Sequence, residues 1–250
     1  SSSAASDVYK RQSVLRAHIT PETVSYERNG NIAVLKISHF NAETAVTLAS
    51  AINEAKQEIG GSLKGLILDL RDNPGGLLYQ SVKVADLFME SGRIISTRGR
   101  HRDSIQLFDA TPGDIINGLP IVVLINGGTA SAAEILAAAL QDNDRAIVIG
   151  SRSYGKGSVQ TVLRMPNNGE LILTWARLHA PSGYKLSGVG IIPTLCTVGV
   201  TKAGDVLYQA FAENGAFWRR LIQLRRDFDR ADPDKQRSIK SYCVDRQDER

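Results

Sequence analysis

Three short apolar segments, each followed at once by a glycine-rich turn, constrain the fold of this chain most strongly. They are residues 65–70, 121–126 and 146–150, and all three are rich in Val, Ile and Leu. Runs of this kind are typical of strands buried on both faces of a parallel sheet. The turns that follow contain the sequences RDNPGG, GGTAS and SRSYGKG. Because open α/β sheets bind ligands at the carboxyl ends of their strands, we expect the three turns to form one site.

Other periodic segments surround these three strands. Helical periodicity is present at residues 43–59, 77–89 and 132–141. Further strands are predicted at residues 31–40, 93–100, 104–108, 158–165 and 170–180. The last two read as a β-hairpin, and the pair before them as a polar excursion. Strands that alternate with helices predict an α/β core of mostly parallel strands, with a hairpin appendage and a charged helical tail after about residue 200.

Composition excludes several classes of protein. The 250 residues are 42% hydrophobic and 22% charged, which is ordinary for a globular chain with a real core. No apolar run approaches the roughly 20 residues of a membrane-spanning helix. The net charge of +4 is small, so nothing indicates a nucleic-acid partner. Cys196 and Cys243 lack a CxxC spacing or a neighbouring His, so no metal site is predicted and their pairing stays open.

Ser131 stands where the second glycine-rich turn enters a helix. Two roles compete for its hydroxyl group. Together with Glu134, three residues later, it can form a capping box at the helix N-terminus. At the end of a buried strand, however, it is also a candidate nucleophile, which requires a base and an oxyanion hole.

The base would be a histidine or a lysine. His18, His39, His101 and His179 all lie away from the glycine-rich strand ends, which disfavours a histidine-based triad without excluding it. Lys156 stands between two glycines in the third turn. We expect it to be buried under close-packed backbone, where a neutral amine could take the serine proton. A phosphate-binding loop is the alternative, but such a loop leads into a helix and here a strand follows.

Several motifs, taken in order and spacing, resemble the carboxyl-terminal processing peptidases of S41 type. They are LILDLRDNPGG, NGGTASAAEI, ALQD, GSRSYGKGSVQ and PSGYKLSGVGIIP, and they span roughly residues 31–195. The resemblance implies a crotonase/ClpP-like α/β core. It also implies a serine endopeptidase without a metal or cofactor, which cleaves extended or unfolded protein substrates near their C-termini through a Ser–Lys dyad.

The resemblance also implies roles for individual residues. Ser131 would be the nucleophile and Lys156 the general base, held in place by Gln160. Residues four apart on a strand share a face, which agrees with that role for Gln160. Backbone N–H groups would form the oxyanion hole. One belongs to Ala132 at the helix start, and the other to Gly75 or Gly76, a choice that stays open.

Asp142 matches an acid implicated in some members of the family. A solvated aspartate at the end of a helix, beside Asn143 and Asp144, is an equal alternative.

The resemblance sets expectations for the organisation of the chain as well. Residues 1–12 resemble translated adaptor sequence and are treated as a non-native leader, with a disordered polar leader as the alternative. Residues 13–200 would form the peptidase catalytic domain, and residues 201–250 a charged helical extension. Family members usually carry a PDZ domain before the core, so we expect a fragment that lacks it. The family's bacterial members mostly work in the periplasm or elsewhere outside the cytoplasm.

Two other functions compete with the peptidase hypothesis. One is a non-catalytic module that binds a peptide or a hydrophobic ligand on the same fold. The other is an enzyme acting on acyl-CoA-type substrates with the similar crotonase fold. The joint presence of Ser131, Lys156 and Gln160 disfavours both, because neither function needs the three residues together.

Overall fold

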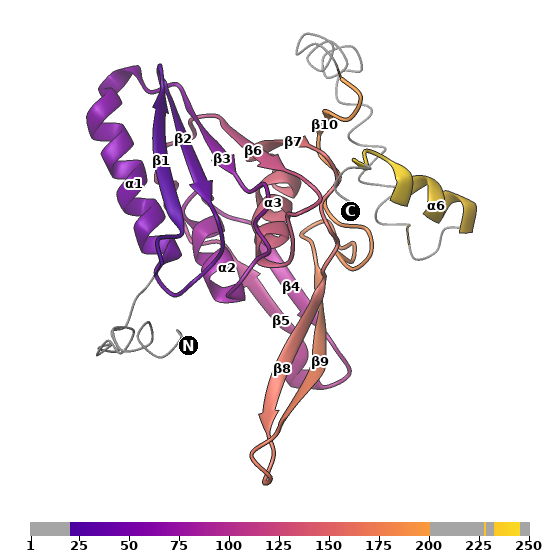
Figure 1. The fold of residues 1–250 in the computed structure, drawn as a ribbon. Helices are drawn as coiled ribbons and strands as arrows, with labels where there is room; N and C mark the ends of the chain where they lie inside the picture. Colours follow the sequence, from indigo (N-terminus) through magenta and orange to yellow (C-terminus); the bar gives the residue numbers. More distant parts are fainter. Residues whose placement is uncertain (1–20, 201–227, 229–232, 246–250) are drawn as a thin grey trace, which may run out of the picture.

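The main sheet contains six strands in the order β1-β2-β3-β6-β7-β10 (Figure 1). They are β1 (Val24–Asn29), β2 (Ile32–Ile37), β3 (Gly65–Asp69), β6 (Ile121–Ile125), β7 (Ala146–Gly150) and β10 (Leu195–Cys196). β1 is antiparallel to β2, and the pairs from β2 to β10 are parallel. The three apolar segments therefore form the adjacent parallel strands β3, β6 and β7, as predicted.

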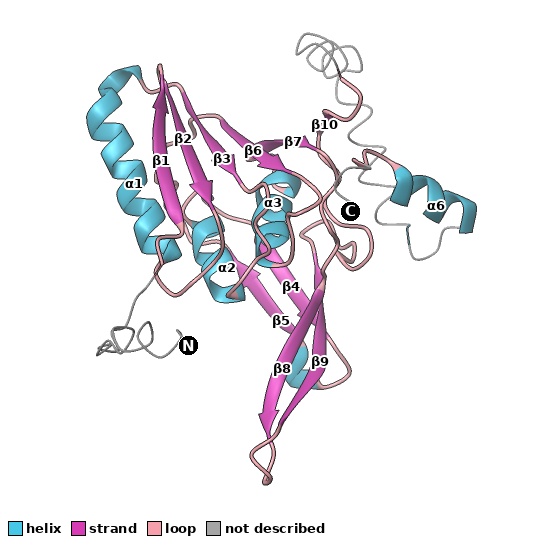
Figure 2. Cartoon of the chain, viewed as in Figure 1, coloured by secondary structure: helices cyan, strands magenta, loops and turns pink. Residues whose placement is uncertain are grey.

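A second sheet has four antiparallel strands in the order β5-β4-β9-β8. They are β4 (Arg93–Arg98), β5 (Gln106–Asp109), β8 (Ser158–Arg164) and β9 (Glu170–His179). The polar excursion and the hairpin are thus parts of one sheet, because β4 pairs with β9. The far end of the β8–β9 hairpin extends away from the rest of the molecule (Figure 2).

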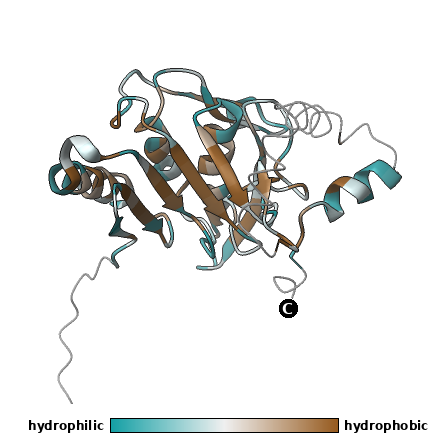
Figure 3. Ribbon diagram, turned by 90° about the horizontal axis from the view of Figure 1, so that it is seen from above, coloured by the Kyte–Doolittle hydropathy of each residue, from teal (hydrophilic) through white to brown (hydrophobic). Residues whose placement is uncertain are grey.

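Three helices cover the main sheet: α1 (Thr44–Ile59), α2 (Leu78–Asp86) and α3 (Ala132–Asp142). Two short 3₁₀ helices are η1 (Gly60–Ser62) and η2 (Arg102–Ser104). α3 contacts β7 in the main sheet and β4 in the second sheet, so it lies between the two. Residues 132–141 of α3 are all buried, which explains why the helix is apolar nearly all round. Figure 3 shows the central strands in the brown of apolar residues.

The structure contains two strands that the sequence analysis did not predict. β1 is joined to β2 by a two-residue turn at Gly30 and Asn31. It is an edge strand with mostly exposed polar residues, so it lacks the apolar pattern that reveals a buried strand. β10 has two residues, too few for any pattern.

A disulfide bond links Cys196 to Cys243, with their Cα atoms 5.8 Å apart. Cys196 lies on β10 at the edge of the main sheet, and Cys243 follows the helix α6 (Pro233–Ser241). The bond therefore attaches the α6 segment to the sheet and answers the question that the sequence left open.

The computed structural model describes residues 21–200, 228 and 233–245. The expected leader at residues 1–12 lies outside the described residues, and so does most of the expected extension at residues 201–250. Within the described ranges no helix is long and apolar enough to cross a membrane.

Candidate active site

The carboxyl ends of β3, β6 and β7 bring the three glycine-rich turns together, as predicted. The backbone N–H of Ala130 donates to the carbonyl oxygen of Asn73 at 2.9 Å, and the Thr129 hydroxyl donates to the Leu70 carbonyl at 2.8 Å. These bonds join the first turn to the second. The N–H of Tyr154 donates to the Thr129 carbonyl at 3.0 Å and joins the third turn to the second. The three turns thus form one hydrogen-bonded unit.

Asn73 holds the first turn in shape from a fully buried position. Its side-chain amide donates to the Ile37 carbonyl at 2.8 Å, and its Oδ1 accepts the N–H of Gly75 at 2.9 Å. The Gly75 carbonyl in turn accepts the N–H of Phe40 at 2.9 Å. Both backbone polar groups of Gly75 are therefore used within the scaffold. The N–H of Gly76, by contrast, makes no hydrogen bond to any residue that the structure describes.

Ser131 has a backbone conformation that side-chain-bearing residues rarely adopt, with φ 55° and ψ −114°. Its ψ lies outside the left-handed helical region that Asp and Asn residues visit. Gly75 lies directly against it. A Cβ atom on Gly75 would be 2.8 Å from the Ser131 Cβ and 2.9 Å from the Ala132 nitrogen. Strain of this kind persists only where surrounding structure imposes it, and it often accompanies function.

Glu134 connects the second turn to the third through its buried carboxylate. Its Oε2 accepts the backbone N–H groups of Ser131 and Lys156, each at 2.8 Å. Its Oε1 accepts the Ser153 hydroxyl at 2.5 Å and the Gly155 N–H at 2.7 Å. The bond from the Ser131 N–H is the capping-box contact of Glu134 that the sequence indicated, whereas the bonds to the third turn were not predicted.

Burial raises the pKa of Glu134 above its ordinary value, although its four hydrogen bonds, with Ser153 first, act against that rise. Ionised carboxylate oxygens accept hydrogen bonds only, which matches four donors around two oxygens. The structure therefore fits the ionised form of Glu134, at the cost of its desolvation.

The side chain of Lys156 is exposed, so the prediction that it is buried is wrong. The two flanking glycines have another physical role. A Cβ atom on Gly157 would collide with the backbone nitrogen of Ser187, so this part of the turn packs backbone against backbone. Gln160, on β8, is likewise exposed. Among the described residues, no side-chain hydrogen bond joins Ser131, Lys156 or Gln160 to one another.

One histidine lies nearer to the site than its place in the sequence indicated. His39 follows β2 and directly precedes Phe40, whose N–H donates to Gly75. The Nδ1 atom of His39 is 3.2 Å from the Ser38 hydroxyl. His101 and His179 belong to the second-sheet region, and His18 lies outside the described residues.

Asp142 at the end of α3 is a structural residue in this geometry. Its Oδ2 accepts the backbone N–H of Ser182 at 3.0 Å and the Ser182 hydroxyl at 2.6 Å. The carboxylate therefore holds the turn that contains Pro181 and Gly183, and it is not the solvated helix-end residue of the alternative reading.

Asp69 and Arg71 brace the start of the first turn. The Arg71 guanidinium donates two hydrogen bonds to the Asp69 carboxylate, at 2.9 and 2.6 Å. Burial raises the pKa of Asp69, but the bonds to Arg71 outweigh that effect and hold the pKa below its ordinary value. Within the described residues, no group of three His, Cys, Asp or Glu side chains could hold a metal ion.

Comparison with known proteins gives one family. The model of Peptidase family S41 matches residues 31–197. A carboxy-terminal-processing protease of Bartonella bacilliformis is 46% identical over 183 residues, which are 73% of this chain and 42% of that protein. The chloroplastic carboxyl-terminal-processing peptidase 3 of Arabidopsis thaliana is 33% identical over 193 residues, 77% of this chain and 37% of that protein. The chain thus spans about two fifths of the length of these relatives.

Among solved structures, a photosystem II D1 C-terminal processing protease superposes with a TM-score of 0.63 at 29% identity. The superposition covers 70% of this chain and 48% of that one. It includes the mixed architecture of a mostly parallel sheet and a second antiparallel sheet, which agrees with the predicted fold class.

Proposed function

The chain belongs to peptidase family S41, and we propose that it is a serine endopeptidase in which Ser131 attacks the substrate and Lys156 takes its proton. One observation carries this assignment: a single oxygen of Glu134 accepts the backbone N–H groups of both residues. The nucleophile turn and the base turn are therefore fixed to each other. The strained backbone of Ser131 supports the same assignment.

The reaction follows from these two side chains. The neutral Lys156 amine accepts the hydroxyl proton as the Ser131 Oγ attacks the scissile carbonyl carbon. Collapse of the tetrahedral intermediate breaks the C–N bond, and the proton passes to the leaving amine. Water then hydrolyses the acyl-enzyme, with Lys156 as the base again. Because Lys156 is exposed, Gln160 or the bound substrate must bring its amine to the serine.

The oxyanion hole is best formed by the backbone N–H groups of Gly76 and Ala132. Asn73 occupies the N–H of Gly75, which favours Gly76 as the donor from the first turn. Ala132 is the first residue of α3, so its N–H has no acceptor within the helix. The helix dipole adds favourable potential for the negative oxygen there.

The substrate is a protein or peptide chain in an extended conformation. β8 is an edge strand of the second sheet and begins two residues after Lys156. A polypeptide can pair with such an edge through backbone hydrogen bonds, with little dependence on sequence. The relatives are carboxy-terminal-processing proteases by name, and we assign a preference for cleavage near the C-terminus here as well.

We also assign the protein to the periplasm or another compartment outside the cytoplasm. The disulfide between Cys196 and Cys243 suits an oxidising environment. In this assignment residues 13–200 form the catalytic domain and residues 201–250 an extension.

Digestion of casein, with the products read by mass spectrometry, tests the proposal. The wild-type chain should cleave casein. Ser131→Ala and Lys156→Ala should abolish cleavage, whereas His39→Ala should retain it. Cleavage by Ser131→Ala at the wild-type rate would require another nucleophile. Loss with His39→Ala but not with Lys156→Ala would make the histidine the base.

A further inference from the structure

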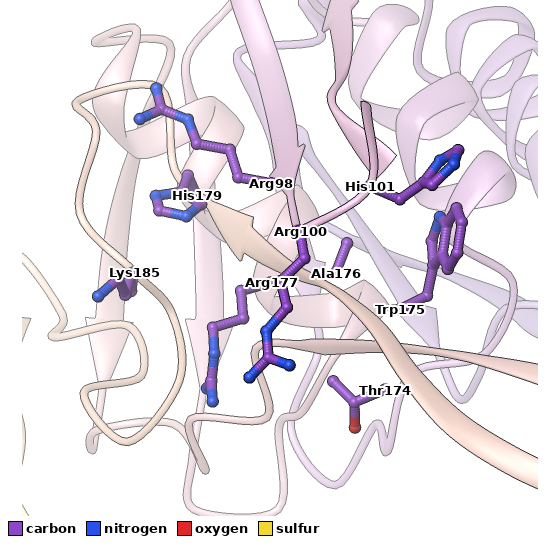
Figure 4. A pocket seen from close by; sticks show the side chains of 10 residues that line it. Arg98, Arg100, His101, Thr174, Trp175, Ala176, Arg177, His179 and Lys185 are labelled. Atoms are coloured by element: carbon purple, nitrogen blue, oxygen red, sulfur yellow. The ribbon is translucent and has the colours of Figure 1, made fainter. Parts of the chain in front are cut away.

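A pocket outside the proposed catalytic centre is lined by basic side chains (Figure 4). It lies where β4 and β9 pair in the second sheet and has a volume of about 730 Å³. Four residues in its lining carry a fixed positive charge, namely Arg98, Arg100, Arg177 and Lys185. Among the described residues that line it there is no Asp or Glu.

The pocket concentrates the charge of the molecule. The net charge of the whole chain is +4, from 30 basic and 26 acidic residues. Without the four positive charges of this pocket, the chain has equal numbers of basic and acidic residues, 26 of each. A concave surface of one charge sign attracts ligands of the opposite sign.

Two of the arginines that line this pocket are exposed and face each other across a strand pair. Arg98 lies directly opposite Arg177 in the β4–β9 ladder. Like charges in directly opposed positions destabilise an antiparallel pair. Neither these two residues nor Arg100 forms a side-chain ion pair with any residue in the described part of the chain. Three guanidinium groups around one pocket, without a carboxylate partner among the described residues, can bind an anion.

Other arginines of the same chain show the contrast. Arg145 reaches the Asp114 carboxylate at 2.9 Å, and Arg93 pairs with Asp109. Near the pocket, Asp103 is exposed and lies 3.5 Å from the His101 ring instead.

The pocket lies close to the proposed catalytic turn. Arg177 pairs with Ser158 on β8, and Ser158 follows Lys156 by two residues. Neighbouring strands are about 5 Å apart, so Arg177 on β9 lies about 10 Å from a polypeptide paired with the β8 edge, a span that an Arg side chain and a Glu side chain can bridge together. The rings of His101 and Trp175, 5.4 Å apart, form an aromatic wall beside them. In Figure 4 the guanidinium groups of Arg100 and Arg177 point the same way.

We propose that this pocket binds carboxylates of the polypeptide substrate and so gives the peptidase a preference for acidic segments near the cut. The proposal rests on the proposed function, because a peptidase brings polypeptides to this face. Planar guanidinium groups match the two oxygens of a carboxylate. The carboxylates come from Asp and Glu side chains or from the C-terminus of the substrate, and the experiment separates these sources.

Fluorescence anisotropy with labelled peptides tests the proposal in the Ser131→Ala background, which prevents cleavage. Four peptides of one length combine Glu or Gln at central positions with a free or an amidated C-terminus. The acidic peptides should bind more tightly, and Arg98→Gln and Arg177→Gln should each weaken that binding about tenfold. If Glu→Gln removes the preference, side chains are the ligand; if amidation removes it, the C-terminus is.

The matched control removes two charges elsewhere. Lys64 is exposed just before β3, at the end of the main sheet away from the glycine-rich turns, and Lys83 is exposed on α2. If the double variant Lys64→Gln and Lys83→Gln weakens the binding of acidic peptides as much as the arginine variants do, the effect comes from the overall charge of the chain. The pocket assignment is then wrong. Equal binding of acidic peptides by the arginine variants and their parent would also overturn it. Thermal unfolding checks the fold, because relief of the like-charge pair should leave the Tm of Arg98→Gln unchanged or raised.

The two proposals fail separately. Absence of a charge preference in the parent chain, when its casein cleavage depends on Ser131, overturns only the pocket. A charge preference in a chain that cleaves casein without Ser131 overturns only the catalytic assignment.

Discussion

At the scale of single residues, the lack of a side chain at Gly75 allows its backbone to pack directly against the proposed nucleophile Ser131. Gly75 adopts φ 104° and fits against Ser131 and Ala132 with no room for a Cβ atom. Its N–H and carbonyl are both bonded to the scaffold. Gly75 therefore acts by close approach, while the N–H of its neighbour Gly76 is the proposed donor to the substrate oxygen.

Gly75→Ala should lower kcat/KM by about 100-fold, because a displaced first turn misplaces the oxyanion donors. Gly118→Ala is the matched control. Gly118 also has a positive φ, 76°, but no atom lies within 4 Å of its missing Cβ. The control should lose stability through backbone strain and keep its activity. Equal activity losses in both variants would show that strain alone, and not contact with Ser131, is responsible.

Glu134→Gln tests the carboxylate that joins the two turns. Each Glu134 oxygen accepts two donors, so the amide NH₂ would face donors in either orientation. We expect kcat/KM to fall about 100-fold through misplacement of Ser131 relative to Lys156. Glu54→Gln, at an exposed position of α1, should have no effect. Full activity in Glu134→Gln would mean that the carboxylate does not position the dyad.

Low pH should inactivate the protein through protonation of Glu134 without unfolding it. Because burial raises its folded-state pKa, this group contributes stability that is fully present below its unfolded pKa and is lost as pH rises through the folded pKa. Activity needs the ionised form and should fall as pH drops through the same raised pKa. Near-UV circular dichroism and peptide hydrolysis across that range should show a folded but reversibly inactive protein. Coincident loss of fold and activity would contradict this.

At the scale of elements, the apolar parallel strands were predictable from the sequence, and the pairing of strands far apart in the chain was not. β3, β6 and β7 leave continuous apolar runs in the sequence, and the rule for parallel sheets then brings their turns together. The pairing of β4 with β9 depends on contacts between distant segments, which no local pattern records. The exposure of Lys156 and the bonds from Glu134 to the third turn also depend on contacts between distant segments, so no local pattern predicted them.

The disulfide between Cys196 and Cys243 should stabilise the edge of the main sheet. The carbonyl of Cys243 accepts the N–H of Arg152, in the turn that leads to Lys156. Replacing both cysteines with Ser should reduce the free energy of unfolding by about 2–4 kcal/mol. Hydrogen exchange at residues 233–245 should become faster. Unchanged exchange there would show that packing of α6, and not the bond, holds the segment.

At the scale of the whole molecule, two sheets enclose the helix that carries the proposed nucleophile at its start. α3 contacts strands of both sheets, so Ser131 stands at the start of a helix that packs between them. Lys156 lies between the two sheets in the chain, after β7 and before β8. The basic pocket belongs to the second sheet, so catalysis and substrate selection would be divided between the sheets.

The most direct test of the central claim is capture of the acyl-enzyme. A peptide p-nitrophenyl ester is mixed with the chain, the burst of p-nitrophenol is recorded, and the acylated residue is mapped by mass spectrometry. We predict one equivalent of acyl group on Ser131, absent in Lys156→Ala and retained in His39→Ala. Acylation of another residue, or an equal burst in wild type and Lys156→Ala, would contradict the Ser131–Lys156 dyad.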